Sequence, residues 1–130
     1  MQDEFIFVYG TLRRGCTTGA HATYLADARF IDCAKIHGKL FRVSYYPALV
    51  LDEHADWVVG EVYQLTSAEQ LARLDAYEEC TYPAVPEQEY QRLRVQVQTA
   101  AGDYLSVWVY AYQRTCKGLE LIASGDFLNP

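Results

Sequence analysis

The apolar positions of this chain recur with the two-residue period of β-strands over much of its length. The alternation is clearest on either side of Gly102 and Asp103, a pair of residues typical of a hairpin turn. The flanking segments, residues 89–99 and 104–112, therefore predict an antiparallel β-hairpin.

Further strands are predicted earlier in the chain. Residues 5–9 form a short run of β-forming residues that stops at a glycine, as expected of a buried strand ending in a turn. Apolar and polar residues also alternate over residues 28–43 and 57–65. Glycine interrupts both segments, so we expect a break in the first strand near Gly38 and a bulge or a close contact at Gly60 in the second.

One segment follows the helical period instead. Over residues 66–77, apolar side chains recur three and four positions apart, and Thr66 with Glu69 matches a capping box. Residues 21–25 add one or two helical turns. Many strands with one clear helix predict an α+β domain built on a curved, largely antiparallel sheet or a small barrel.

Length, composition and charge narrow the class of protein. The 130 residues fit one domain, residues 1–130, and 51% of them are hydrophobic. A net charge of −6 without a basic stripe argues against nucleic acid or an anionic membrane as a partner. No apolar run approaches the roughly 20 residues that span a bilayer, and the acidic start is the reverse of a signal peptide. We therefore expect a cytoplasmic protein, either a monomer or a homodimer.

The cysteines give no support for a disulfide scaffold. A scaffold of this length would be denser in cysteine, so we expect reduced and mostly half-buried thiols. A zinc site would have to combine cysteine and histidine at irregular spacings, and we predict no metal site. The four cysteines are Cys16, Cys33, Cys80 and Cys116.

One carboxylate occupies an unexpected place in the helical pattern. Glu78 follows Leu71 by seven positions and Leu74 by four, which puts it on the apolar face. Burial and the nearby helix C-terminus would both raise its pKa above the ordinary value of about 4.3. A glutamate with a raised pKa suits general acid and base catalysis near neutral pH. Alternatively, the helix ends first and Glu78 turns to solvent beside Glu79.

The first predicted strand runs into a glycine-containing loop. Backbone N–H groups in such a loop can converge on an anion or on a developing oxyanion. The loop lacks the residues of a P-loop or of a dinucleotide fingerprint, and an ordinary structural turn is the alternative.

Several short segments, in order along nearly the whole chain, match the pattern of one known family. They are Y-G-T-L at 9–12, Y-P-A-L at 46–49, G-E-V-Y at 60–63, L-D-A-Y-E at 74–78, Y-x-R at 90–92, W-x-Y at 108–110 and S-G-D-F at 124–127. Together they resemble the gamma-glutamylcyclotransferase-like family. Two departures from its pattern are Glu79, where a glycine commonly follows the glutamate, and residues 81–86, which differ from the usual short link and could reshape the cavity rim.

The resemblance implies a fold and an activity. The fold is a small mixed, largely antiparallel β-barrel with flanking helices and a cavity in its mouth. The activity is a cyclotransferase reaction on a γ-glutamyl amine or peptide, with the substrate's own α-amine attacking the γ-carbonyl to release 5-oxoproline and a free amine. No metal or organic cofactor is implied. The identity of the leaving amine does not follow from the sequence.

The resemblance also implies roles for particular residues. Glu78 would be the catalytic acid and base, with Glu79 as the alternative. The backbone N–H groups of the loop would hold the substrate carboxylate or the oxyanion. Arg92 and Tyr110 are weaker candidates for lining the site, with strand packing or surface pairing as the alternative. The expected substrate-binding residues are Tyr9, Gly10, Thr11, Leu12, Arg92 and Tyr110.

Two other classes of function stay open on this sequence. One is a different small-molecule enzyme in the same cavity, such as a lyase or an amide hydrolase. The other is a binding or interaction module that keeps the fold without catalysis. A fold is shared by many functions, so the choice depends on the site.

Overall fold

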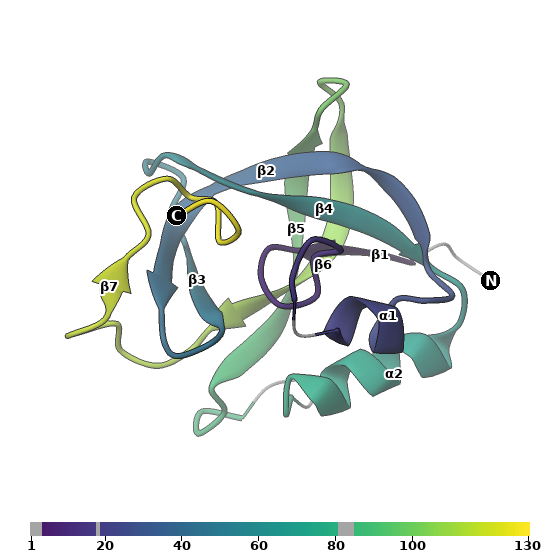
Figure 1. Ribbon diagram of the computed structural model, residues 1–130, viewed down its shortest axis with the longest axis horizontal. Coiled ribbons are helices and arrows are strands. Elements are labelled where there is room, and N and C mark those ends of the chain that lie inside the picture. Colours follow the sequence, from purple (N-terminus) through teal and green to yellow (C-terminus); the bar gives the residue numbers. More distant parts are fainter. Residues whose placement is uncertain (1–3, 18, 81–84) are drawn as a thin grey trace.

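The computed structural model describes residues 4–17, 19–80 and 85–130. The two helices are α1 (Ala20–Tyr24) and α2 (Ala68–Tyr77) within these residues, and α1 matches the helical turns expected at 21–25. The strands are β1 (Glu4–Val8), β2 (Arg29–Arg42), β3 (Pro47–Leu51), β4 (Trp57–Leu65), β5 (Tyr90–Thr99), β6 (Tyr104–Tyr112) and β7 (Glu120–Leu121) (Figure 1).

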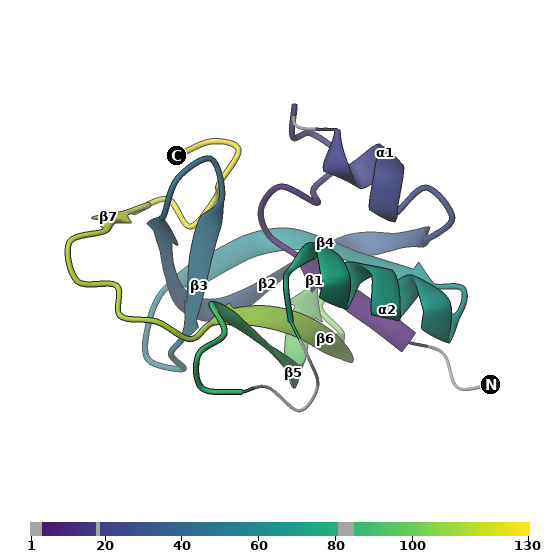
Figure 2. The same ribbon diagram turned by 90° about the horizontal axis from the view of Figure 1, so that it is seen from below.

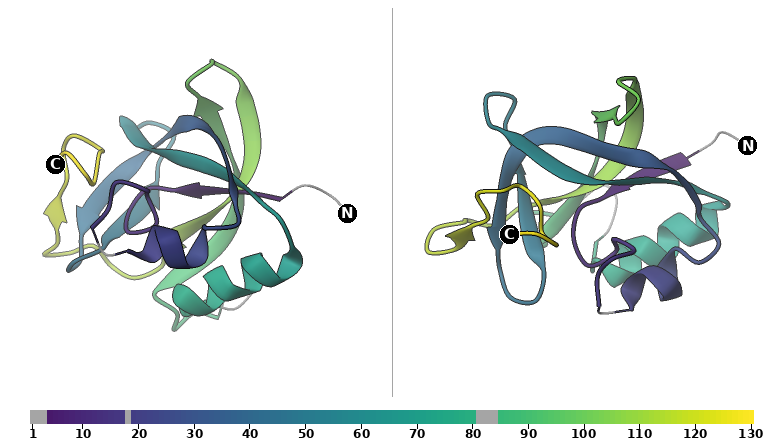
Figure 3. Two further views of the ribbon diagram at one scale, coloured as in Figure 1. Left: turned by 45° about the vertical axis from the view of Figure 1, so that its right-hand side comes forward. Right: turned by 45° about the horizontal axis from the view of Figure 1, so that its top comes forward.

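Five of these strands close into a mixed barrel. They are hydrogen-bonded in the order β2, β4, β1, β6 and β5, and β5 returns to β2 through Ala34 opposite Thr99 and Lys35 opposite Gln98. All pairs are antiparallel except β1 with β6, which is parallel. The predicted α+β barrel is therefore confirmed, and the β5–β6 hairpin projects beyond it (Figures 1 and 3).

The break expected near Gly38 is absent, because β2 runs without interruption over 14 residues. Gly38 instead marks the point where β2 changes partner, from β4 to β3, since His37 lies opposite Trp57 and Gly38 opposite Leu51. A Cβ atom on Gly38 would lie 2.7 Å from the backbone oxygen of Val50. The glycine is needed for close approach of the new partner strand, and it leaves the hydrogen-bonded ladder intact.

At Gly60 the sequence predicted a bulge or a close contact, and the structure shows a close backbone contact. A Cβ atom there would lie 2.2 Å from the backbone oxygen of Val8, at the end of β1. The strand that leads into the candidate loop therefore packs directly against the backbone of β4.

The apolar run of β1 is explained by burial on both faces. Phe7 belongs to the cluster of buried side chains shared with β2, β4, β5 and β6, whereas Ile6 and Val8 belong to a second cluster. This second cluster includes Leu74 of α2 and Leu25 after α1. Figure 2 shows the two helices at one end of the molecule, with β3 and β7 at the other.

The start of α2 differs from the predicted capping box. Ser67 is the N-cap, and its hydroxyl accepts a hydrogen bond from the Gln70 backbone N–H at 3.2 Å. The Gln70 side chain in turn accepts one from the Thr66 N–H at 2.9 Å. The predicted pair, Thr66 with Glu69, is therefore wrong by one residue. Gln70 is buried and Glu69 is exposed, because burying a neutral amide costs less free energy than burying a charged carboxylate.

All four cysteines are free thiols, as expected: Cys33 is exposed, Cys80 is buried, and Cys16 and Cys116 are half-buried. Within the described ranges, no group of three or more histidine, cysteine or acidic side chains is placed to hold a metal ion. In the same ranges, no helix is both long enough and apolar enough to cross a bilayer.

Candidate active site

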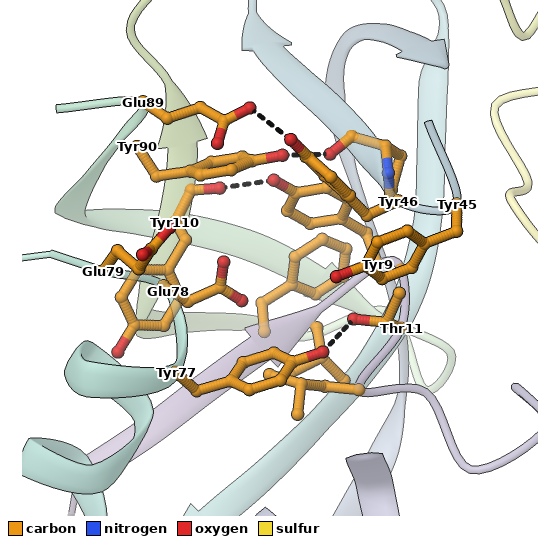
Figure 4. Close-up of a pocket in the computed structure, with 15 residues that line it drawn as sticks. Tyr9, Thr11, Tyr45, Tyr46, Tyr77, Glu78, Glu79, Glu89, Tyr90 and Tyr110 are labelled. Carbon is orange, nitrogen blue, oxygen red and sulfur yellow. Dashed lines mark hydrogen bonds between the residues drawn. The ribbon is translucent and has the colours of Figure 1, made fainter. Parts of the chain in front are cut away.

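A pocket of about 200 Å³ opens where the end of β1, the end of α2, the β2–β3 connection and the start of β5 meet (Figure 4). Six of the predicted site residues line it: Tyr9, Gly10, Thr11, Leu12, Glu78 and Tyr110. Their neighbours in the wall are Phe7, Val8, Tyr45, Tyr46, Pro47, Tyr77, Glu79, Glu89 and Tyr90. Residues 81–86 were expected to reshape the rim of this cavity, but residues 81–84 lie outside the described residues.

The C-terminus of α2 determines which of the two neighbouring glutamates faces the pocket. The Glu79 N–H donates to the Ala76 carbonyl at 3.1 Å and the Cys80 N–H to the Asp75 carbonyl at 2.8 Å, which is the Schellman pattern. Glu79 takes the left-handed conformation (φ 53°) at the position where a glycine is common in this motif. Glu79 is exposed, whereas Glu78 is half-buried and points into the pocket (Figure 4). The helix does end before Glu78, but the alternative that its side chain turns to solvent is wrong.

The Glu78 carboxylate is placed among tyrosines. No hydrogen bond or ion pair from the described residues reaches it, and Figure 4 shows it directed between Tyr9 and Tyr77. Burial, with a smaller contribution from the charge of Glu89, raises the pKa of Glu78 from 4.5 to about 8. The rise that was expected from the helical pattern is therefore confirmed, and it brings the titration of Glu78 close to neutral pH.

The phenol groups around Glu78 stay protonated in this pH range. They come from the residue after β1 and from α2, β5 and β6. Burial is the largest cause of the raised pKa in each of Tyr9, Tyr77, Tyr90 and Tyr110. Tyr46, beyond β2, has a pKa raised to about 12, chiefly by its hydrogen bond to Glu89. Charge in the pocket near neutral pH is therefore carried by its glutamates.

The raised pKa makes the stability of the fold depend on pH. Between pH 4.5 and 8 the unfolded chain loses the Glu78 proton while the folded chain keeps it, so the free energy of unfolding falls as pH rises. We expect Glu78→Gln to remove this loss. The difference in unfolding free energy between variant and wild type should grow by about 2 kcal/mol from pH 4 to pH 9, allowing for screening by water at the pocket mouth.

Urea unfolding of the wild type and of Glu78→Gln across this pH range measures that difference. The contributions of all other titrating groups to the unfolding free energy are common to both proteins and cancel. Glu79→Gln is the matched control, because Glu79 is the exposed neighbour and its substitution should give a nearly constant difference. A constant difference for Glu78→Gln as well would contradict the raised pKa.

Buried ion pairs hold the loop that follows β1. Arg13 Nε lies 3.1 Å from Glu61 Oε2, and Arg13 Nη1 lies 2.7 Å from Asp126 Oδ1. Glu61 also accepts hydrogen bonds from the Arg14 N–H at 3.1 Å and from the Tyr63 hydroxyl at 2.8 Å. The loop is thus supported from below by contacts among three segments that matched the family pattern separately. They are residues 9–12 with the arginines that follow, residues 60–63 and residues 124–127.

The pocket side of the loop is held by aromatic and small residues. The Tyr9 hydroxyl donates to the Tyr110 carbonyl, and the hydroxyls of Thr11 and Tyr77 lie 2.8 Å apart (Figure 4). A Cβ atom on Gly10 would lie 2.6 Å from Pro47 Cγ, so glycine is required for the loop to pass beside the Y-P-A-L segment. These contacts fix the loop opposite Glu78.

Arg92 is the predicted site residue that the structure does not bring into the pocket. It is buried beside the pocket, with its guanidinium 4.3 Å from the centre of the Trp108 ring and Nε 3.3 Å from Asp75 Oδ1. Asp75 also accepts a hydrogen bond from the Tyr110 hydroxyl at 2.7 Å. Arg92 therefore has the packing role weighed as its alternative, and Tyr110 offers the pocket its ring while its hydroxyl is bound to α2.

Sequence reasoning missed the other half of the pocket wall. Tyr46 and Tyr90 lie in segments that matched the family pattern, but neither was chosen as a site residue. Glu89 gave no local signal, because its partner Tyr46 is 43 positions away, and their hydrogen bond of 2.7 Å forms only when the barrel closes.

Comparison with known proteins shows which family the chain is similar to. Residues 6–129 match the family described as gamma-glutamyl cyclotransferase, AIG2-like. The gamma-glutamylcyclotransferase family protein YtfP of Escherichia coli is 34% identical over 125 residues, which are 95% of this chain and 96% of that protein. Its solution structure superimposes with a TM-score of 0.67 over 96% of each chain at 35% identity.

Other solved structures show the same fold. An AIG2-like protein from Mus musculus has a TM-score of 0.74 at 26% identity, over 95% of this chain and 88% of that one. YkqA from Bacillus subtilis has a TM-score of 0.72 at 26% identity, with 97% of this chain matching 40% of that longer one. The family match over nearly the whole sequence and the E. coli relative show that this chain belongs to the gamma-glutamyl cyclotransferase, AIG2-like family.

Proposed function

We propose that this protein is a γ-glutamyl cyclotransferase, which converts a γ-glutamyl amine or peptide into 5-oxoproline and a free amine. The observation that carries the proposal is the Glu78 carboxylate, half-buried with a pKa of about 8, facing the loop of residues 9–12 across a small pocket. Family membership supports the same reaction class.

The reaction needs little more than positioning and one proton carrier. The substrate's α-amine attacks its own γ-carbonyl, so the nucleophile is already tethered and the pocket has only to fold the substrate into attack geometry. Glu78 takes a proton from the α-ammonium and returns one to the departing nitrogen. The positive ammonium beside Glu78 favours its ionised form, which prepares the base when substrate binds.

The remaining pocket groups bind and orient the substrate. The backbone N–H groups of Gly10, Thr11 and Leu12 hold the α-carboxylate or the oxyanion that develops on the γ-carbonyl. The rings of Tyr9 and Tyr110 form apolar walls around the closing five-membered ring. A pocket of about 200 Å³ suits a γ-glutamyl group, with the leaving amine directed toward the mouth.

The test is a panel of γ-glutamyl amides and peptides incubated with the purified protein, with 5-oxoproline measured as the product. Turnover of at least one compound, releasing amine and 5-oxoproline in equal amounts, is the expected result. Release of glutamate in place of 5-oxoproline would identify an amide hydrolase, and a silent panel combined with ligand-dependent thermal stabilisation would identify a binding module.

A further inference from the structure

Asp75 is a carboxylate that the proposed reaction does not use, and it lies in an unfavourable place. It belongs to the last turn of α2, where the helix dipole disfavours negative charge. Only 18% of its side chain is exposed, although Arg73 and Ala76 on the same helix are exposed. A carboxylate kept largely out of water at this end of a helix needs compensating contacts, and these contacts show what it holds in place.

Two barrel strands supply the contacts. Arg92 Nε of β5 lies 3.3 Å from Asp75 Oδ1, and the Tyr110 hydroxyl of β6 donates to the same oxygen at 2.7 Å. Figure 4 shows this hydroxyl directed toward α2. The backbone carbonyl of Asp75 also accepts the Cys80 N–H at 2.8 Å, which closes the turn around Glu78. Asp75 therefore joins the turn that carries Glu78 to both strands.

The ion pair also balances the charge of Arg92. The Arg92 side chain is only 9% exposed and packs on the Trp108 ring. Burial and the hydrogen bond to Asp75 are the largest causes of the raised pKa of Tyr110. Beyond these, the charges of Asp75 and Glu78 raise this pKa and the charge of Arg92 lowers it, so all three charges act at one point. Because Asp75 has the opposite charge at 3.3 Å, it cancels most of the field that Arg92 would exert on Glu78.

The other groups around Glu78 do not take over this role. None of the pocket-lining residues in the described parts of the chain is lysine, arginine or histidine. The phenols stay protonated near neutral pH, so the charges near Glu78 are those of Glu79 in water, of Glu89 and of the pair Arg92 with Asp75. The titratable groups that face Glu78 across the pocket are Tyr9 after β1, Tyr46 before β3, Glu89 and Tyr90 at the start of β5, and Tyr110 of β6.

We propose that Asp75 is a positioning residue for Glu78: it fixes the end of α2 against β5 and β6 and neutralises Arg92 beside the pocket. The inference rests on the proposed function and goes beyond it, because Asp75 acts only through its neighbours and not on the substrate. The ammonium of the substrate loses its charge when its proton moves to Glu78. An uncompensated Arg92 would keep its charge and would leave Glu78 a weaker base.

The experiment measures the ionisation of Glu78 and the reaction separately. NMR titration of the protein labelled with ¹³C at the glutamate carboxyl carbons gives the pKa of Glu78, whose signal is identified by its absence in Glu78→Gln. The pH profile of kcat/KM for 5-oxoproline release follows the same ionisation in the working enzyme. The substrate is the γ-glutamyl amide that the wild type converts fastest.

Substitutions of the two partners should shift this pKa in opposite directions. Asp75→Asn keeps the shape of the side chain but leaves Arg92 uncompensated, so it should lower the pKa of Glu78 by about 1 pH unit. Arg92→Gln leaves Asp75 uncompensated and should raise it by a similar amount. The double variant carries neither charge and should return the pKa to the wild-type value of about 8. A purely structural role would not produce opposite shifts.

Tyr110→Phe tests the positioning without changing a charge. It removes the hydroxyl that is bonded to Asp75, so kcat should fall about tenfold while the pKa of Glu78 changes little. KM should stay near the wild-type value, because the ring remains in the pocket.

Arg94→Gln and Glu69→Gln are the matched controls. Arg94 also contacts the Trp108 ring from β5, but it pairs with Glu4 and is 42% exposed. Glu69 is an exposed carboxylate of α2. Both substitutions should leave the pKa of Glu78 and kcat/KM unchanged.

The proposal would be overturned if Asp75→Asn and Arg92→Gln shifted the pKa of Glu78 in the same direction or not at all, or if Tyr110→Phe kept the wild-type kcat. Should the single variants fail to fold, the double variant decides, because a shifted pKa in it would contradict the balance of charges. The NMR titration needs no turnover. A silent γ-glutamyl panel would therefore overturn the cyclotransferase, while opposite pKa shifts would still show that Asp75 controls the ionisation of Glu78.

Discussion

Glu78→Gln should lower kcat/KM for 5-oxoproline release by about 10³-fold while the chain stays folded. The amide has the shape of the carboxylate but cannot take the proton from the α-ammonium or return one to the leaving nitrogen. Because no hydrogen bond or ion pair from the described residues reaches the Glu78 carboxylate, its replacement by an amide breaks no contact that supports the fold. Activity and stability should therefore separate, with activity lost and stability kept or increased.

The measurement is the pH profile of kcat/KM for the wild type and the variant. The wild-type rate should rise with pH up to an apparent pKa of about 8, the value for the free enzyme, and the residual rate of the variant should lack this limb. Glu79→Gln tests the neighbouring carboxylate, which is exposed and should be dispensable for proton transfer. Full activity of Glu78→Gln together with loss in Glu79→Gln would move the base to Glu79.

Arg13→Met should destabilise the protein by about 3–5 kcal/mol. The side chains of Arg13 and Glu61 are only 12% and 6% exposed, so removal of the guanidinium leaves the Glu61 carboxylate buried without its cation. Asp126 loses its partner too, and hydrogen bonds from Arg13 are a principal reason that the pKa of this carboxyl is lowered despite partial burial. Arg13→Lys should recover part of the loss, since lysine keeps the charge but cannot bridge two carboxylates as the guanidinium does.

Urea unfolding at pH 7 measures this loss, and Arg42→Met supplies the comparison. Arg42 pairs with Glu120 at 3.5 Å, but these side chains are 35% and 75% exposed, and an exposed pair contributes about 0–1 kcal/mol. If Arg13→Met were no more costly than Arg42→Met, the loop would not depend on its buried ion pairs.

The sequence predicted those parts of the fold that local pattern determines. Alternation located the β5–β6 hairpin to within one residue, because both strands are amphipathic and their turn has a glycine with positive φ. The alternation pattern failed where two local structures fit the sequence equally well and a contact with a distant strand decides between them. Gly38 has the local mark of a strand break, yet the arrival of β3 makes it a change of partner.

The candidate site divides in the same way. Glu78 could be found because its own helix places it on the apolar face, and the loop of residues 9–12 because it follows a strand. Glu89 could not be found, because its position depends on Tyr46, which comes from a different part of the barrel. Arg92 was a weaker candidate for the pocket because it falls in a segment that resembles the family pattern, and such a pattern does not show which neighbour the side chain meets, which here is Asp75 of α2.

The parallel pairing of β1 with β6 has a consequence for how the protein is made. Ile6 lies opposite Trp108, so β1 has to wait for a strand that is synthesised much later than itself. Pairing over such a separation is slow, since the intervening chain must be ordered first. Until then β1 presents an apolar edge with unpaired backbone groups, which other chains could bind. A nascent chain that has not yet released β6 will thus depend most on molecular chaperones, and it will acquire its pocket only after β6, which carries Tyr110, has emerged.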